Sequence, residues 1–303
     1  MSASARLVFL MSAMAVAALL PADIAAQQSA ESWSAVDRAL GRVGAAQPGA
    51  VQKYSFPRSD LSVTVASTRL KPALALGSWV AFKRVGQGQA MAMGDLVLTD
   101  DEVPAMMSRL QQGGVEQTAL HNHVLNELPH VMYMHIMARG DEARIAQTIH
   151  DALASSHTPL TAPAAGAPAT LDMDTLAVAR TLGYAGKPNG GVYQVSVPRP
   201  ERITDDGVDV PPSMGVATAL NIQPTGSGRA VATGDFVLLA KEVNPVIRAL
   251  RDHGIAVTAL HSHLLGEAPR LLFMHFWADD ELAKVTAGLR AALDVTAMRP
   301  PAK

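Results

Sequence analysis

The feature that most constrains the fold of this chain is an internal duplication. Residues 94–138 align with residues 234–278 at a constant offset of 140, and 19 of the 45 aligned positions are identical. The similarity continues upstream to about residue 40 with small shifts in register. A match of this length indicates two copies of one structural unit. We therefore expect repeat 1 at residues 32–155 and repeat 2 at residues 171–296, joined by a linker rich in Pro and Ala at residues 156–170.

Within each repeat the residue pattern predicts an α+β domain. In repeat 1 we expect a leading helix near residues 36–40, and strands at residues 61–66, 78–83, 90–98, 115–123 and 130–138. Further helices are expected from Asp100 or Asp101 to Gly113–Gly114 and at residues 141–153. Repeat 2 carries the equivalent elements and closes with a helix at residues 279–293. The sequence predicts two tandem homologous units, each a largely antiparallel sheet covered by helices, whose sheets share a face.

The first 26 residues have the pattern of a secretory signal peptide. Arg6 precedes an apolar run of 14 residues from Leu7 to Leu20, and the small residues Ala25 and Ala26 follow. The run is shorter than the ~20 residues that cross a bilayer as a helix. We expect a periplasmic or secreted protein with no stable membrane anchor after cleavage.

Composition narrows the classes of partner. Lys and Arg number 25 against 27 Asp and Glu, with no basic cluster, so the positive surface that nucleic acids require is missing. The chain has no cysteine, which excludes disulfides, thiolate metal sites and cysteine nucleophiles. A small molecule or a metal ligand is the expected partner, and the oligomeric state is left open.

A histidine pattern carries the chemical signal. The spacing His-x-His-x3-Glu-x7-His occurs in both repeats, as His121, His123, Glu127 and His135, and as His261, His263, Glu267 and His275. Asn122, His130 and Tyr133 are replaced in repeat 2 by Ser262, Arg270 and Phe273, whereas these eight residues are kept. Imidazole nitrogen with a carboxylate suits a divalent transition metal, zinc first and then iron, manganese, nickel or copper.

Strand geometry suggests how these ligands would meet. Residues two apart in a strand share a face, so His121 and His123 should lie side by side. A hairpin centred on residue 128 would place His135 directly opposite His121. Glu127, in the turn, would reach the edge of the histidine patch as a ligand or a general base, and Glu267 would do so in repeat 2. We expect one such site in each repeat.

Residues around the motif are given smaller roles. We interpret Asp95 and Asp235 as turn or cap residues, with a carboxylate that supports a ligand histidine as the alternative. Thr118 and Thr258 are interpreted as structural residues facing away from the histidines. The methionines Met132, Met134 and Met137 are interpreted as core filling rather than as copper(I) ligands. Tyr133 should lie on the ligand face, where it could donate a proton. Since Phe273 takes its place in repeat 2, such a role would leave only repeat 1 active.

The repeated TALH-x-H-x3-E-x-P block, the leading secretion signal and the preceding Gly-Asp strand resemble the LppY/LpqO family of bacterial envelope proteins. That resemblance implies an envelope location and a duplicated module of unassigned function, although this chain lacks the cysteine that carries lipid in the lipoprotein members. The His-x-His-x3-Glu spacing is also similar to half of a cupin motif, which we treat as convergent ligand geometry.

Three functions fit the sequence. The first is a metal-dependent enzyme of hydrolase or lyase type acting on a small molecule, with Glu127 and Glu267 as catalytic residues that manage the proton. The second is a non-catalytic module that binds a metal or a metal–ligand complex through all four side chains of each motif. The third is an interaction protein whose histidines only stabilise its sheets.

Overall fold

A computed structural model describes residues 32–161 and 170–298 of the chain. The segment expected to be a signal peptide lies outside these residues. Residues 34–303 form one compact unit that contains both repeats. Among the residues that the structure describes, no helix is long and apolar enough to cross a membrane.

Repeat 1 contains nine strands and four helices within the described residues. In chain order they are α2 (Ser34–Leu40), β1 (Ala45–Gln47), β2 (Val51–Pro57), β3 (Thr64–Val65), β4 (Thr68–Arg69), α3 (Pro72–Ala75), β5 (Gly77–Gly86), β6 (Gln89–Thr99), α4 (Val103–Gln112), β7 (Glu116–His121), β8 (Glu127–Leu128), β9 (Val131–Asp141) and α5 (Glu142–Leu153). The Asp141 carboxylate caps α5 by accepting a hydrogen bond from Arg144 N at 2.8 Å.

Repeat 2 follows the same order, except that a short 3₁₀ turn replaces α3. Its elements are α6 (Thr175–Leu182), β10 (Lys187–Asn189), β11 (Val192–Pro198), β12 (Thr204–Asp205), β13 (Val208–Asp209), η1 (Pro212–Met214), β14 (Ala217–Gly226), β15 (Arg229–Leu238), α7 (Ala240–Asp252), β16 (Ala256–His261), β17 (Glu267–Ala268), β18 (Leu272–Glu281) and α8 (Leu282–Asp294).

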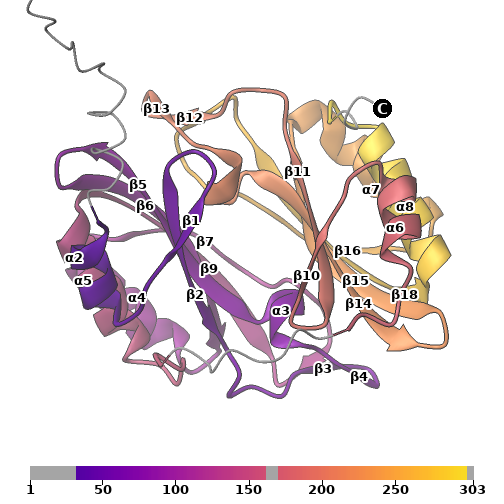
Figure 1. The fold of residues 1–303 in the computed structure, drawn as a ribbon, viewed down its shortest axis with the longest axis horizontal. Coiled ribbons are helices and arrows are strands. Elements are labelled where there is room, and N and C mark those ends of the chain that lie inside the picture. Colours follow the sequence, from indigo (N-terminus) through magenta and orange to yellow (C-terminus); the bar gives the residue numbers. More distant parts are fainter. Residues whose placement is uncertain (1–31, 162–169, 299–303) are drawn as a thin grey trace, which may run out of the picture. The chain divides into compact units, whose positions relative to one another are not determined.

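Each repeat builds one six-stranded antiparallel sheet with the same strand order. The order is β1-β2-β5-β6-β9-β7 in repeat 1 and β10-β11-β14-β15-β18-β16 in repeat 2. Helices α2, α4 and α5 lie on one side of the first sheet, and α6, α7 and α8 lie on one side of the second (Figure 1). The predicted fold class, two tandem α+β units with antiparallel sheets covered by helices, is confirmed.

The faces of the two sheets that carry no helices pack against each other through apolar side chains. One cluster joins Met93 and Met137 of repeat 1 to Val210 and Phe273 of repeat 2, and another joins Val97 to Val231. Met134 and Met137 are buried, Met137 in the first of these clusters, as the sequence suggested for core residues, whereas Met132 is partly buried. Helices cover the outer face of each sheet and the other sheet covers the inner face, which explains why the central strands β6 and β15 are buried along nearly their whole length.

Two local predictions were wrong. The strand expected at residues 61–66 is only β3, because its partners are the two-residue strands β4 and β8 rather than a long neighbour. The hairpin register is also different: His121 is paired with Tyr133, and His135 with Ala119. The register shifts between Gln117 and Ala119, and Glu127–Leu128 leave the hairpin to pair with β3, so the turn is not the simple one that we assumed.

Candidate metal centre

Six histidines, three from each repeat, gather where the two sheets meet. His121 and His261 end the edge strands β7 and β16, His123 and His263 follow them, and His135 and His275 lie in the neighbouring strands β9 and β18. Ring centroids are 3.7 Å apart between His121 and His261, 3.8 Å between His123 and His275, and 3.7 Å between His135 and His263. Each of these close pairs takes one member from each repeat.

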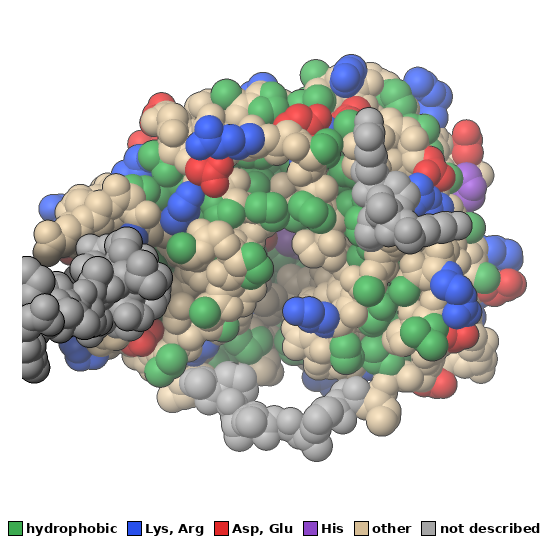
Figure 2. Space-filling model, turned by 45° about the horizontal axis from the view of Figure 1, so that its top comes forward, with side chains coloured by type: hydrophobic (Ala, Val, Ile, Leu, Met, Phe, Trp, Pro, Cys, Tyr) green, Lys and Arg blue, Asp and Glu red, His purple; other side chains and the backbone are tan. Residues whose placement is uncertain are grey.

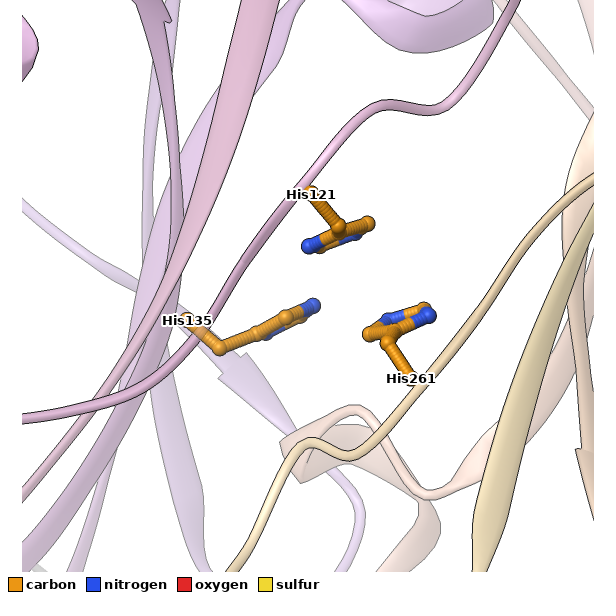
Figure 3. A group of neighbouring side chains, drawn as sticks. All are labelled: His121, His135 and His261. Carbon is orange, nitrogen blue, oxygen red and sulfur yellow. The ribbon is translucent and has the colours of Figure 1, made fainter.

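Ligand atoms from both repeats come within metal-binding range of one another. Three groups have ligand atoms that all lie within 4.8 Å: His121, His123 and His275; Asp235, His261 and His263; and His121, His135 and His261. We call the first group half-site A and the second half-site B. The third group, shown in Figure 3, connects them.

The three groups differ from the histidine trio expected in each repeat. No group contains all of His121, His123 and His135, and the group that lies wholly in repeat 2 contains Asp235 in place of His275. Half-site A completes its set with His275 from the other repeat. The physical reason is the packing of the two inner sheet faces, which brings the motif of one repeat onto the strands of the other.

Backbone carbonyls fix the orientation of three of the rings. The Nδ1 atoms lie 3.3 Å from Gly94 O for His135, 2.9 Å from Gly215 O for His263, and 2.7 Å from Gly234 O for His275. A carbonyl oxygen only accepts, so each Nδ1 carries the proton and donates it. The Nε2 lone pair of each ring is then left for another partner, as in histidines that bind metals.

Several polar atoms of the centre are buried without a hydrogen-bond partner in the described part of the chain. They are Asp95 Oδ1, Asp235 Oδ1, His121 Nδ1, His123 Nε2, His135 Nε2 and His261 Nδ1. An unsatisfied buried polar group costs roughly 1–3 kcal/mol, so such a concentration calls for an explanation. A bound cation would accept the lone pairs of the nitrogen and carboxylate donors among them.

The electrostatics of the centre favour neutral imidazoles. Burial lowers the pKa of His135 to about 3 and of His263 to about 4, and it lowers the pKa values of His121, His123 and His261 well below the usual range, helped by the neighbouring histidines. Burial raises the pKa of Asp235 to about 7. Neutral imidazole is the form that binds metal ions.

The sequence favoured a turn or cap role for Asp95 and Asp235, with support of a ligand histidine as the alternative. Both lie inside strands, β6 and β15, rather than in turns. Asp235 Oδ2 lies 2.9 Å from His263 Nε2, and Asp95 Oδ2 lies 3.4 Å from His123 Nε2. In the strand register, each also lies opposite the last histidine of its own repeat, Asp95 opposite His135 and Asp235 opposite His275. An acidic residue kept at the same place in both buried strands was the available signal.

Glu127 and Glu267 lie outside the three ligand groups. Both carboxylates are buried and face their own turns: Glu127 Oε1 accepts from Val131 N at 3.4 Å, and Glu267 Oε1 accepts from Leu271 N at 2.9 Å. Arg270 donates to the second oxygen of Glu267 at 3.2 Å. Their predicted roles as ligands or bases stay predictions, and the contacts seen here are those of turn residues.

Two threonines hold the histidine loops across the repeat boundary. Thr118 Oγ1 donates to His263 O at 2.7 Å, and Thr258 Oγ1 donates to His123 O at 2.6 Å. Tyr133 and Phe273 stack on the rings of His123 and His263, with centroids 3.3 and 3.5 Å apart. Figure 2 looks onto a hollowed face on which a histidine side chain, in purple, is visible near the centre.

Comparison with known proteins yields a family and no characterised relative. The family model described as Domain of Unknown Function (DUF1259) matches residues 34–155 and again residues 176–295. This match corrects the resemblance to the LppY/LpqO family, because the family assigned is DUF1259; a short histidine block was too little to fix a family name. No curated protein matches the chain.

Two solved structures are similar at a low level. A trimeric bacterial microcompartment shell protein, PduB, is 15% identical over 84% of this chain and 90% of its own, with a TM-score of 0.21. EtuB from Clostridium kluyveri is 12% identical over 83% of this chain and 90% of its own, with a TM-score of 0.20. Scores this low support no conclusion about this chain.

Proposed function

The chain belongs to the DUF1259 family, in two copies of its domain, and from this premise we propose that the duplication serves to build one shared centre for divalent metal ions. The ligands are the six histidines together with Asp235, and Asp95 supports them. Zinc is the first candidate, because buried neutral imidazoles with a carboxylate match its preferred donors, and iron, manganese, nickel and copper remain alternatives.

The observation that carries this proposal is the set of buried histidine nitrogens and aspartate oxygens that have no hydrogen-bond partner among the described residues. Histidine rings buried for packing alone normally hydrogen-bond through both nitrogens. Here His135 donates through Nδ1 to a backbone carbonyl and leaves Nε2 unsatisfied in the centre of the cluster. The Nε2 atom of His263 is left with a lone pair and lies 2.9 Å from Asp235 Oδ2, so the two atoms repel each other unless a cation binds both.

Metal analysis of protein purified without an affinity tag tests the proposal. We expect wild-type protein to retain a divalent transition metal, or to take one up after chelation. His121→Ala and His261→Ala should each lower the metal content, because each ring belongs to two ligand groups. His253→Ala is the matched control, since His253 is exposed and donates only to Ala249 O in its own helix. Wild-type protein that takes up no metal would refute the shared centre.

A metal-dependent enzyme is the second candidate. His123 and His261 are only partly buried, so the centre is not sealed from solvent on every side. An ion reached by solvent can bind water, lower its pKa and promote hydrolysis or a lyase reaction on a small molecule. A storage or structural site would instead favour complete enclosure.

We also propose that the protein is exported to the periplasm or secreted. This rests on the apolar run and small-residue exit of the first 26 residues. Fractionation of the source cells, with mass determination of the mature N-terminus, tests it: protein that stays in the cytoplasm with residues 1–26 attached would contradict export.

A further inference from the structure

The two halves of the centre differ at one position by a single hydroxyl group. Tyr133 is paired with His121 in repeat 1, and Phe273 is paired with His261 in repeat 2. Both rings are fully buried and lie nearly parallel to the following histidine, at 11° over His123 and 12° over His263. The two rings therefore pack in the same way, and packing alone does not explain why repeat 1 has a hydroxyl group at this position.

The Tyr133 hydroxyl is buried and has no hydrogen-bond partner among the described residues. A buried phenol without an acceptor costs roughly 1–3 kcal/mol relative to a phenylalanine of the same shape, which repeat 2 shows to fit. A phenolic hydroxyl can donate one hydrogen bond, which the phenylalanine of repeat 2 cannot. What it lacks is an acceptor.

The ligand sets of the two half-sites also differ, in charge. Half-site B has two imidazoles and the Asp235 carboxylate, whose negative charge offsets part of the charge of a bound dication. Half-site A has three imidazoles, and Asp95 does not belong to its group. Three protein ligands leave a tetrahedral ion one further position, and the half-site without a carboxylate is the one that includes His123, the histidine on which Tyr133 stacks.

We propose that the ion held by His121, His123 and His275 takes a small oxygen-donor anion as its remaining ligand, and that the Tyr133 hydroxyl donates a hydrogen bond to that anion. This inference rests on the proposed metal centre. A dication bound by three neutral imidazoles keeps its full positive charge, which favours an anionic fourth ligand such as a carboxylate. The phenol then gains the acceptor that the protein does not supply.

Cobalt(II) loading of the full chain with acetate as the probe tests this proposal. Cobalt(II) reports a change of ligand through its visible absorption. We expect acetate to change the wild-type spectrum saturably. Tyr133→Phe should keep its cobalt and bind acetate more weakly by on the order of tenfold or more, the usual value of a hydrogen bond to a charged group.

The duplicated chain offers its own control. Phe273→Tyr adds a hydroxyl beside half-site B, where the Asp235 carboxylate disfavours a further anion, and should leave acetate affinity unchanged. The double variant that combines Tyr133→Phe with Phe273→Tyr moves the hydroxyl from half-site A to half-site B. Its acetate affinity should equal that of Tyr133→Phe alone. Thermal melting of each variant checks that folding is intact.

The possible failures are distinguishable. Wild-type protein that binds cobalt but shows no acetate-dependent spectrum overturns the open position at half-site A. Equal acetate affinity in wild type and Tyr133→Phe overturns the role of the hydroxyl. Wild-type protein that binds no cobalt or other divalent metal refutes the proposed function itself, and this inference with it.

Discussion

At the scale of single residues, one hydrogen bond decides what a histidine of the centre can do. Once Nδ1 of His275 donates to Gly234 O, its Nε2 has only a lone pair to offer, and that atom lies 3.1 Å from His121 Nε2. The sequence predicted that the histidines of the repeated motif would gather, because residue type and spacing are visible there. The carbonyl that selects the tautomer is a backbone atom of another strand, and no residue pattern reveals it.

The buried histidines should make the metal-free protein sensitive to acid. Burial lowers the pKa of His135 to about 3 and of His263 to about 4, below the 6.5 of an exposed histidine, so the folded state binds fewer protons than the unfolded state. The free energy of unfolding should therefore fall as the pH drops from about 6.5 through those values. Burial raises the pKa of Asp235 to about 7, so this group alone would increase the free energy of unfolding as the pH drops from about 7 to about 4. The several buried histidines outweigh this single carboxyl group.

Thermal melts in the presence of a chelator measure this dependence. We expect the Tm to decline steadily between pH 6.5 and 4, with a shallower decline in His263→Gln. His253→Gln, on the surface, should keep the wild-type slope. A metal-free protein as stable at pH 4.5 as at pH 7 would show that the histidines are not buried in the neutral form.

At the scale of secondary-structure elements, the alternation of side chains along a strand correctly predicted which histidines share a face. The register between the two strands was predicted wrongly. His121 and His135 do share a face, as predicted, because alternation is a property of each strand alone. Their offset depends on the loop at residues 122–130, whose Glu127 and Leu128 pair with β3 instead of closing the hairpin. That partner lies about 60 residues earlier in the chain, beyond the reach of turn rules.

The threonines of β7 and β16 should contribute to stability as well as to the centre. Thr118→Val keeps the shape of the side chain and removes the donor to His263 O, which should destabilise the protein by about 1–3 kcal/mol, measured by urea unfolding. Thr258→Val should act alike on His123 O. Ser108→Ala, which removes an exposed bond to Pro104 O, serves as the control and should change stability by less than about 0.5 kcal/mol. An effect of Thr118→Val no larger than that of Ser108→Ala would mean that the hydroxyl is not needed to hold the loop.

Buried arginines join strands to helices in both repeats. Arg58 donates to Val97 O and to the Glu102 carboxylate, both at 2.7 Å, and Arg199 donates to Val237 O at 2.8 Å and to Glu242 at 2.7 Å. Arg58→Met leaves the Glu102 carboxylate buried without its cation, which should cost about 3–5 kcal/mol.

A second substitution isolates the charge. Glu102→Gln combined with Arg58→Met removes both charges and should recover part of the loss, as urea unfolding would show. A double variant no more stable than Arg58→Met would indicate that the arginine acts through packing instead of through its partner.

At the scale of the whole molecule, the duplication brings the histidine motifs of both repeats into one cluster. The sequence showed two copies of a motif and suggested two separate sites, because each copy looks complete by itself. The sequence also suggested that the two sheets share a face, but it did not show which histidines would then meet. Rings from opposite repeats, His123 with His275 and His263 with His135, are closer than rings within one repeat.

Double-mutant cycles can decide between a shared centre and a separate site in each repeat. Removal of one ligand largely abolishes an ion's contribution to stability, so removal of a second ligand to the same ion adds little. The quantity to measure is the rise in Tm on adding zinc. If the half-sites are shared, His123→Ala and His275→Ala should be strongly non-additive although they lie in different repeats, whereas His123→Ala and His263→Ala, from different half-sites, should be closer to additive. Separate sites would reverse the pattern: His123 would then couple to His135 in its own repeat, and His275 would be independent of both. His253→Ala combined with any of them should change nothing, because its side chain lies outside the ligand groups.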